Sequence, residues 1–311
     1  MLQRWFMALC FCVIGAAHAA ENSTSIKADE LIEVPANSDT DIDTILTNKM
    51  MRAESGSKSK WSIATGLSYS GGTIESPLAA SRPNIAGATG STDEALLDGS
   101  ISAKYSLSAS QALLAGVGVR WITPLQGTAK PSGYSGDKVD ADNPNFVYQY
   151  IYKFWGVQAV TQAQVTYFTD SNLVEEGYLA SFGLSQNNAY EIGHSHVSVG
   201  TFAYTGLGFY DKNDFINKQN QSDYSWGFEP FIEYQMSDRL NLRSSWNLWI
   251  FEHIRAQSDP NTYRWDKVTQ SVGVGISVTR DFFLYPNIQF LPDNVRSDLT
   301  TVALSSNLNI F

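Results

Sequence analysis

The feature that most constrains the fold is a pair of long alternating stretches, residues 224–236 and 239–251, on either side of Ser237-Asp238. Apolar and polar residues take turns along both stretches, which is the period of side chains on a β-strand. Each stretch has about 11 to 13 residues, whereas strands of soluble proteins usually have about 5 to 6. A tilted strand of about 9 to 11 residues can cross a bilayer. We therefore predict a hairpin of long strands whose apolar side faces lipid.

Residues 1–20 have the pattern of a secretory signal peptide. Arg4 precedes the apolar run 5–17, and Ala17-His18-Ala19 supplies the small residues of a cleavage site. The apolar run is too short to span a bilayer, which takes about 20 residues in a helix. We expect this segment to be removed and the mature chain to be exported.

The remaining composition excludes several classes of protein. Both cysteines, Cys10 and Cys12, lie in the signal segment, so the mature chain is predicted to have neither a disulfide nor a cysteine nucleophile. Without Arg4 the chain has 20 basic and 31 acidic residues, a balance that argues against binding to nucleic acid. No later apolar run reaches about 18 residues, which argues against membrane-spanning helices.

Residues 21–60 form a polar segment without aromatic residues. The segment contains an apolar pattern that fits one short amphipathic helix with an acidic first turn. The acidic residues are Asp39 and Asp41, which precede the pattern, and Asp43, which lies within it. The apolar positions of that pattern are Ile42, Ile45, Leu46 and Met50. We expect either a flexible periplasmic tail or a plug or docking helix, because helices fill some barrel interiors.

Twelve strand-like stretches follow, and an even number is typical of single-chain bacterial barrels. Their expected bounds are 61–70, 96–108, 111–122, 146–155, 157–169, 176–186, 194–210, 224–236, 239–251, 268–279, 282–291 and 299–311. Two prolines, Pro230 and Pro286, fall inside these stretches. Because proline has no N–H to donate, we expect each to mark a bulge or an unpaired position.

The links between these stretches alternate in length. The first and third links, 71–95 and 123–145, are long and polar, whereas Ala109-Ser110, Ser237-Asp238 and Arg280-Asp281 form short turns. Long outer loops and short periplasmic turns are the pattern of outer-membrane barrels. This pattern predicts that both termini lie in the periplasm.

The signal segment, the strands, the loop asymmetry and the terminal Phe311 together resemble a Gram-negative outer-membrane β-barrel. The resemblance covers residues 61–311 and implies an all-β fold, a transmembrane antiparallel β-barrel of 12 strands, in contact with outer-membrane lipids. It also implies recognition of the C-terminal aromatic residue by the barrel-assembly machinery. One departure is that the alternate positions counted back from Phe311 begin with Asn309, while the apolar series begins with Ile310. A bulge near the end would reconcile the two series.

If the apolar faces contact lipid, the opposite faces line a lumen. Strands one, two and ten contribute mainly small residues, and strands five, eight, nine and eleven contribute bulkier ones, among them Trp249. The charged residues expected to line the lumen are Lys104, Arg120, Lys153, Glu229, Glu233 and Arg243. The hairpin register places Glu233 near Arg243 and Glu229 near Asn247. Such charges either brace the wall or form a constriction that selects solutes.

We interpret the chain as a porin-like channel for passive diffusion of small hydrophilic solutes, without a cofactor. The alternative is a closed barrel with a structural or surface-interaction role, in which the long loops carry the function. A twelve-stranded barrel is intermediate between barrels filled by side chains and wide porins, so both hypotheses remain open.

His196-Val197-Ser198 is the one stretch that suggests an enzyme. It is similar to the His-x-Ser pair of outer-membrane phospholipase A, which also has a twelve-stranded barrel. A metal site formed by Glu191, His194 and His196 has suitable ligand types but lacks a fourth partner. A polar lumen lining explains these residues more simply. We therefore predict no catalytic residues and no metal site.

Overall fold

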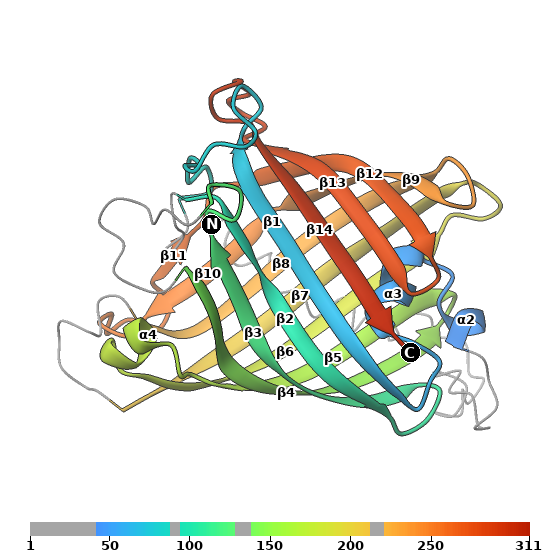
Figure 1. Cartoon of the computed structure of the whole chain (residues 1–311), viewed down its shortest axis with the longest axis horizontal. Helices are drawn as coiled ribbons and strands as arrows, with labels where there is room; N and C mark the ends of the chain where they lie inside the picture. Colours follow the sequence, from blue (N-terminus) through green and yellow to red (C-terminus); the bar gives the residue numbers. More distant parts are fainter. Residues whose placement is uncertain (1–41, 88–93, 128–137, 212–220) are drawn as a thin grey trace, which may run out of the picture.

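The computed structural model describes residues 42–87, 94–127, 138–211 and 221–311, and these residues form a β-barrel with short helices at its two ends (Figure 1). The signal segment 1–20 and residues 21–41, including Asp39 and Asp41, lie outside the described residues. The predicted all-β fold is confirmed. No helix in the described ranges is long and apolar enough to cross a membrane.

The strands run antiparallel; from β1 to β8 each pairs with the next in sequence, β8 pairs with both β9 and β10, β9 pairs with β12, and β1 pairs with β14 to close the sheet. The strands are β1 (Trp61–Thr73), β2 (Leu96–Ser106), β3 (Gln111–Ile122), β4 (Val139–Phe154), β5 (Val157–Tyr167), β6 (Tyr178–Glu191), β7 (Val197–Tyr210), β8 (Ser222–Gln235), β9 (Leu240–Asn247), β10 (Trp249–Ile254), β11 (Tyr263–Trp265), β12 (Thr269–Thr279), β13 (Phe282–Phe290) and β14 (Thr301–Ile310). The helices are α2 (Ile42–Ile45), α3 (Lys49–Ser55) and α4 (Ser171–Glu175).

Two strands of the wall are each interrupted once. Asn247 pairs with Thr269 between β9 and β12, and Phe251 pairs with Trp265 between β10 and β11. The ladder therefore keeps one register across both interruptions, so β9 and β10 act as one strand and β11 and β12 as another. Over the described residues the barrel has the predicted 12 strands.

The interruption at Leu248 reverses which side chains face outward. Regular pairing of β8 with β9 ends at Phe231–Ser245, and pairing with β10 begins one residue out of register at Phe228–Trp249. Trp249 consequently stacks on Phe228 at a ring-centroid distance of 5.4 Å, on the outer face. The expectation that Trp249 faces the lumen is wrong for this reason. The expected pairing of Glu229 with Asn247 is also absent from the ladder.

Both prolines coincide with gaps in the ladder. Pro230 pairs with Thr201 of β7 but has no partner on its other side, where β9 gives way to β10. Pro286 pairs with Leu304 of β14, and the ladder between β12 and β13 is missing at its position. The predicted unpaired positions are therefore present, because a proline cannot donate to the ladder.

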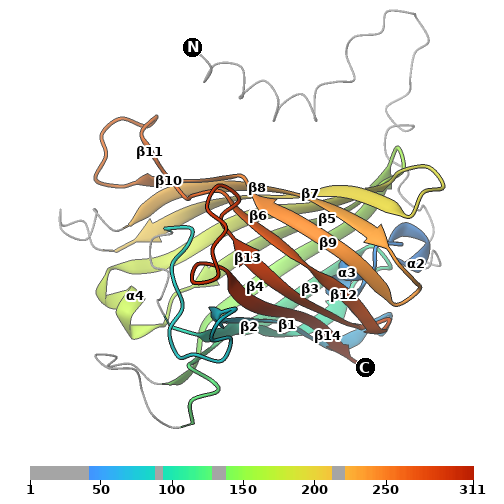
Figure 2. The same cartoon turned by 90° about the horizontal axis from the view of Figure 1, so that it is seen from above.

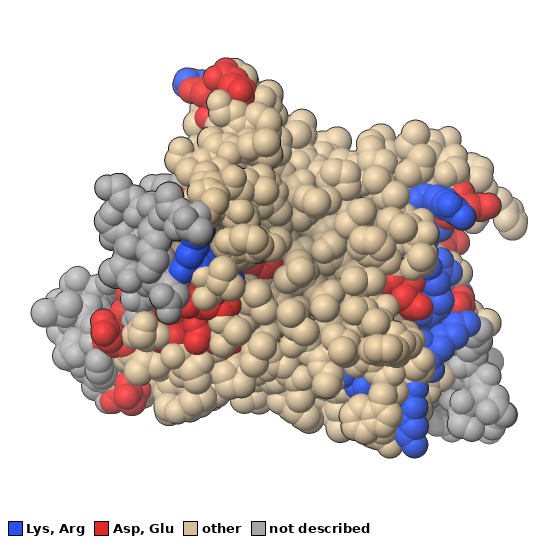
Figure 3. Space-filling view, viewed as in Figure 1, with Lys and Arg blue, Asp and Glu red and all other residues tan. Residues whose placement is uncertain are grey.

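The two faces of the wall differ as the alternation predicts. On β8, Ile232 and Tyr234 point outward and are 42% and 50% exposed, whereas Phe231 and Glu233 point inward and are buried. On the face shown in the space-filling view, the middle of the barrel is almost free of charged residues, Lys and Arg lie with some Asp and Glu at one end, and mainly Asp and Glu lie at the other (Figure 3). This middle region corresponds to the apolar band of a transmembrane barrel.

We call the end with the short connections the turn end and the opposite end the loop end. The turn end carries connections such as Trp155-Gly156 and Ser237-Asp238, the C-terminus, α2 and α3; the loop end carries α4 and β11 (Figures 1 and 2). The expected alternation of long and short links is therefore present, although the link after β5 contains α4 rather than only polar coil.

Some predicted boundaries are wrong. β4 begins at Val139 rather than at 146, and β7 begins at Val197, which leaves His194 and His196 in the preceding turn. The one helix expected in the polar segment is two short helices, α2 and α3. A helix break follows because Asn48 has extended backbone angles and caps α3, accepting a hydrogen bond from the N–H of Met51 at 3.1 Å.

The C-terminus resolves the departure in the last strand. Asn309 points into the lumen and is buried, while Ile310 is 41% exposed on the outer face. Phe311 lies beyond the end of β14 with a positive φ of 82°. The pairing of β14 is regular at this end of the strand, so no bulge joins the two series, and Phe311 lies outside the ladder in which side chains alternate.

Candidate functional site: the closed end of the lumen

Residues 42–56, which include both N-terminal helices, fill the lumen at the turn end, and we call them the plug (Figures 1 and 2). Leu46 and Met51 are fully buried. One apolar cluster combines plug residues with the wall: Ile42, Ile45, Leu46, Met51, Ile151, Val160, Ala189 and Phe231. A second cluster packs Ala53 against Phe283 and Tyr285 of β13. The described part of the polar segment therefore packs against the inner side of the wall.

The backbone of the plug is hydrogen-bonded to inward-facing amides of the wall. Gln158 of β5 accepts bonds from the N–H groups of Thr47 and Asn48 through one oxygen, both at 2.8 Å. Gln149 of β4 donates to the carbonyl of Ser55 at 3.2 Å. These bonds satisfy backbone groups that neither α2 nor α3 satisfies, which fixes the depth of the plug in the lumen.

Two further side chains bind the end of α3. Lys104 of β2 donates to the carbonyl of Ser55, and Asn309 of β14 donates to the carbonyl of Ala53. Lys104 is only 3% exposed. Because helix C-termini carry partial negative charge, a buried lysine at this position is electrostatically favourable.

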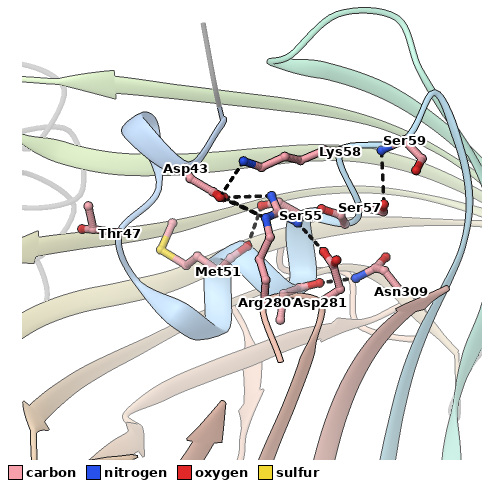
Figure 4. A network of polar contacts seen from close by, with 12 residues as sticks. Asp43, Thr47, Met51, Ser55, Ser57, Lys58, Ser59, Arg280, Asp281 and Asn309 are labelled. Carbon is pink, nitrogen blue, oxygen red and sulfur yellow. Dashed lines mark hydrogen bonds and ion pairs between the residues drawn. The ribbon is translucent and has the colours of Figure 1, made fainter. Parts of the chain in front are cut away.

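An ion cluster closes the outer edge of the plug (Figure 4). Arg280, in the turn between β12 and β13, donates to Asp43 at 2.9 Å and to the carbonyl of Gly56 at 3.0 Å. Lys58 lies 2.8 Å from the other carboxylate oxygen of Asp43. Burial raises the pKa of Asp43, but the hydrogen bonds from Arg280 and Lys58 outweigh that effect and lower it overall.

Beneath α3, Glu233 of β8 and Arg243 of β9 form an ion pair in which both side chains are more than nine-tenths buried. The second carboxylate oxygen of Glu233 accepts a hydrogen bond from the side chain of Asn48 at 2.7 Å. The guanidinium of Arg243 lies 3.8 Å from the ring centroid of Phe231. The pair therefore joins two wall strands to the plug.

Glu54 is the one carboxylate that the plug carries into the lumen interior. Its oxygen accepts a hydrogen bond from Asn187 of β6 at 3.3 Å. Burial raises the pKa of Glu54, and the bond from Asn187 and the charge of Arg243 offset this only in part. Seating the plug therefore shifts the Glu54 carboxyl toward its protonated form.

The six charged residues expected to line the lumen do not form one ring. Lys104, Glu233 and Arg243 meet at the plug, and Lys153 lies near the turn end of β4, paired with Gln158. Glu229 stands beside the strand break. Arg120 lies in the loop half, where it contacts Asp140 and Asp170.

Uncharged groups also hold the plug, and none of them is among the residues predicted from the sequence to line the lumen: Asn48, Gln149, Gln158, Asn187 and Asn309. A search for charged side chains passes over them. Their positions in the sequence could have identified them. Each of the four wall residues lies on an inward-facing position of its strand, close to the turn end. Side-chain amides at such positions can bind a backbone that enters the lumen.

The histidines do not form a catalytic site with Ser198. His196 lies in the turn before β7 and packs edge-on against Tyr234, which faces outward, at 6.3 Å between ring centroids. Ser198 pairs with Glu233 and faces inward. Among the described residues no group of three His, Cys, Asp or Glu side chains has the arrangement of a metal site.

In its closed antiparallel sheet, apolar outer belt and polar lumen the chain has the architecture of an outer-membrane β-barrel. No known family matches its sequence, and no curated protein matches it. Its fold is similar to that of the NanC porin, at 9% identity over 80% of this chain and 98% of the porin, with a TM-score of 0.43. An outer membrane channel from Pseudomonas putida F1 is 13% identical over 82% of this chain and 97% of the channel, with a TM-score of 0.46.

The outer membrane phospholipase A of Escherichia coli is similar as well. It is 16% identical over 79% of this chain and 89% of the enzyme, with a TM-score of 0.35. These likenesses concern the fold.

Proposed function

We propose that this protein is an outer-membrane channel for small hydrophilic solutes whose periplasmic mouth is closed by the plug. The observation that carries the proposal is the position of residues 42–56 across the turn end of an otherwise polar lumen. Solutes enter from the loop end and pass when the plug leaves its seat. In this orientation both termini are periplasmic.

Several features favour a plug that is able to move. The segment precedes β1 and is tied to the wall mainly through polar side chains such as Lys104, Gln158 and Arg280. Polar contacts can be exchanged for contacts with water, so each contributes little in net terms, about 0.5 to 1.5 kcal/mol for a typical hydrogen bond and about 1.5 to 3 kcal/mol where one group is charged. The two apolar clusters oppose release.

Charge gives a direction to selectivity. Acidic residues predominate at the loop end, among them Asp140, Asp142, Asp170, Glu175 and Glu176 (Figure 3). A mouth of one sign raises the local concentration of counter-ions. We propose that small cations are favoured over small anions at entry.

Planar-bilayer conductance tests this function. Three refolded forms are compared: residues 21–311, a version lacking 21–59, and a control lacking only 21–41, which keeps the plug. We expect steady conductance only from the version that lacks 21–59. Conductance from all three forms would show that the lumen is open despite the plug.

A second function is a closed barrel that acts through its long loops. The two apolar clusters around the plug favour it, because they hold the mouth shut as a protein core does. Silence from all three forms, with heat-modifiable migration showing folded barrels, would select this function. We propose no catalytic step, since His196 and Ser198 face different sides of the wall.

A further inference from the structure

A cavity of about 520 Å³ lies in the loop half of the lumen, against the wall formed by β5 to β8. Pockets that hold small ligands usually have about 300 to 1,000 Å³. Its lining includes Phe168, Tyr178 and Tyr210, at the strand ends opposite the plug, so a ligand that enters from the loop end would meet it before the plug.

Glycines create this space. Gly183 of β6 and Gly206 of β7 are a cross-strand pair and both line the cavity. On the next strand, a Cβ at Gly227 would lie 2.2 Å from the ring of Tyr204, so the absence of a side chain lets that ring lie against the wall. The hollow is therefore built into the sequence of three adjacent strands.

The cavity offers neutral hydrogen-bonding groups. The side-chain nitrogen of Gln164 donates to Thr166 at 2.9 Å, which leaves its amide oxygen as an acceptor. The hydroxyls of Ser181, Ser185 and Tyr204 make no hydrogen bond to any described residue. These groups can donate to and accept from the hydroxyls of a ligand.

Aromatic rings stand among these polar groups. Phe202 and Tyr204 lie 5.8 Å apart between ring centroids, and Tyr178 and Tyr210 lie 4.9 Å apart nearer the loop end. All four line the cavity. They provide flat apolar faces that are polar only at the phenol oxygens.

Charge distinguishes among hydrophilic ligands. Of the described residues that line the cavity, only Glu252 is charged, and Arg264 of β11 binds its carboxylate. The described part of the lining has no lysine or arginine to pair with an anion. The lining thus favours neither anions nor cations.

We propose that this cavity is a binding site for neutral carbohydrate, a hexose or a short oligosaccharide. Sugar rings combine hydroxyls, which match Gln164, Ser181 and Ser185, with C–H faces that pack on rings such as Phe202 and Tyr204. The proposal deepens the proposed function, because it names the hydrophilic solute. Binding from the loop end does not require the plug to move.

Isothermal titration calorimetry tests the site on refolded residues 21–311 in a detergent without a sugar headgroup. Glucose and maltotriose are the neutral probes, trigalacturonate is the acidic probe and arginine is the cationic probe. We expect saturable binding of a neutral sugar only. The absence of such binding, or tighter binding of trigalacturonate or arginine, overturns the proposal.

Variants locate the binding. Gly183→Leu places a side chain in the cavity, where a Cβ has its nearest neighbour 3.8 Å away, and we expect at least a tenfold loss of affinity. Tyr204→Phe removes a hydroxyl while it keeps the ring, and Gln164→Ala removes the acceptor. Each should weaken binding, whereas the control Ser305→Ala on β14 should not.

Heat-modifiable migration shows whether each variant is folded. If Gly183→Leu does not fold, Tyr204→Phe takes its place as the test of the site. Sugar binding that is unchanged in the folded variants overturns the site. Because calorimetry does not depend on conductance, sugar binding to a silent barrel would leave this site in place while the channel function failed. Conductance without sugar binding would support the channel function and overturn the sugar site.

Discussion

Glu233 and Arg243 are joined across neighbouring strands, and the carboxylate of Glu233 also holds Asn48 of the plug. Removing one partner of a buried pair leaves an uncompensated charge, which typically costs about 3 to 5 kcal/mol. We therefore expect Arg243→Met to destabilise the barrel by about 3 kcal/mol in urea unfolding from detergent micelles. The double variant Glu233→Gln with Arg243→Met should recover part of this loss. A stability of Arg243→Met equal to wild type would contradict the role of the pair.

Lys104 gives a separate test of the plug. Its ammonium donates to the carbonyl of Ser55, and a hydrogen bond to a charged group contributes about 1.5 to 3 kcal/mol. We expect Lys104→Met to raise the open probability in single-channel recordings by tenfold or more, since 1.4 kcal/mol is a factor of ten. Ser102→Ala, on the same inward face of β2, is the matched control. Equal open probabilities in the two variants would remove Lys104 from the closing contacts.

Glu54 makes closure depend on pH. The seated plug raises the pKa of this carboxyl, mainly through burial, above its ordinary value of 4.5. The seated state is penalised when Glu54 is ionised, so the penalty is fully present above the raised pKa and disappears as pH falls through it. We expect channel opening to increase as pH rises across that window and to change little in Glu54→Gln. The Asp43–Arg280 contact acts in the opposite direction but only at lower pH, because the pKa of Asp43 is lowered. An identical pH profile in Glu54→Gln would sink this assignment.

A single cysteine can report plug exposure, because residues 21–311 contain no cysteine. Met51 is 1% exposed, so we expect Met51→Cys to react with a maleimide at least tenfold more slowly than Lys58→Cys, at a half-exposed position. Combining Met51→Cys with Lys104→Met should speed the reaction. Fast labelling of Met51→Cys alone would place the plug outside the lumen in solution.

The barrel was predictable because alternation is repeated in every strand and each register error would turn an apolar face into the lumen. The break at Leu248 was not predictable, since residues 248–251 are all apolar and their sequence does not show which of them face outward. The signal lay on the neighbouring strand, where Pro230 cannot donate to a ladder. The gap at Pro230 shifts the register of the adjacent strand, and the face of Trp249 depends on this shift. Alternation within residues 239–251 alone therefore predicts the wrong face for Trp249.

The contacts of the candidate site were likewise predictable from the sequence only in part. Local register was sufficient to pair Glu233 with Arg243, which lie close in sequence across one turn. The contacts of the plug join residues that are far apart in the chain, such as Asn48 with Glu233 and Ala53 with Asn309. No periodicity encodes such contacts, because they depend on where a polar segment stops inside the closed wall.

The seat of the plug also sets an order of events in biogenesis. The plug is synthesised before any strand, yet Phe283 and Asn309, which bind it, belong to the last two strands. Its resting place does not exist until the whole wall has been made. The plug must therefore remain unfolded, or bound to another site, until the first and last strands pair and enclose it.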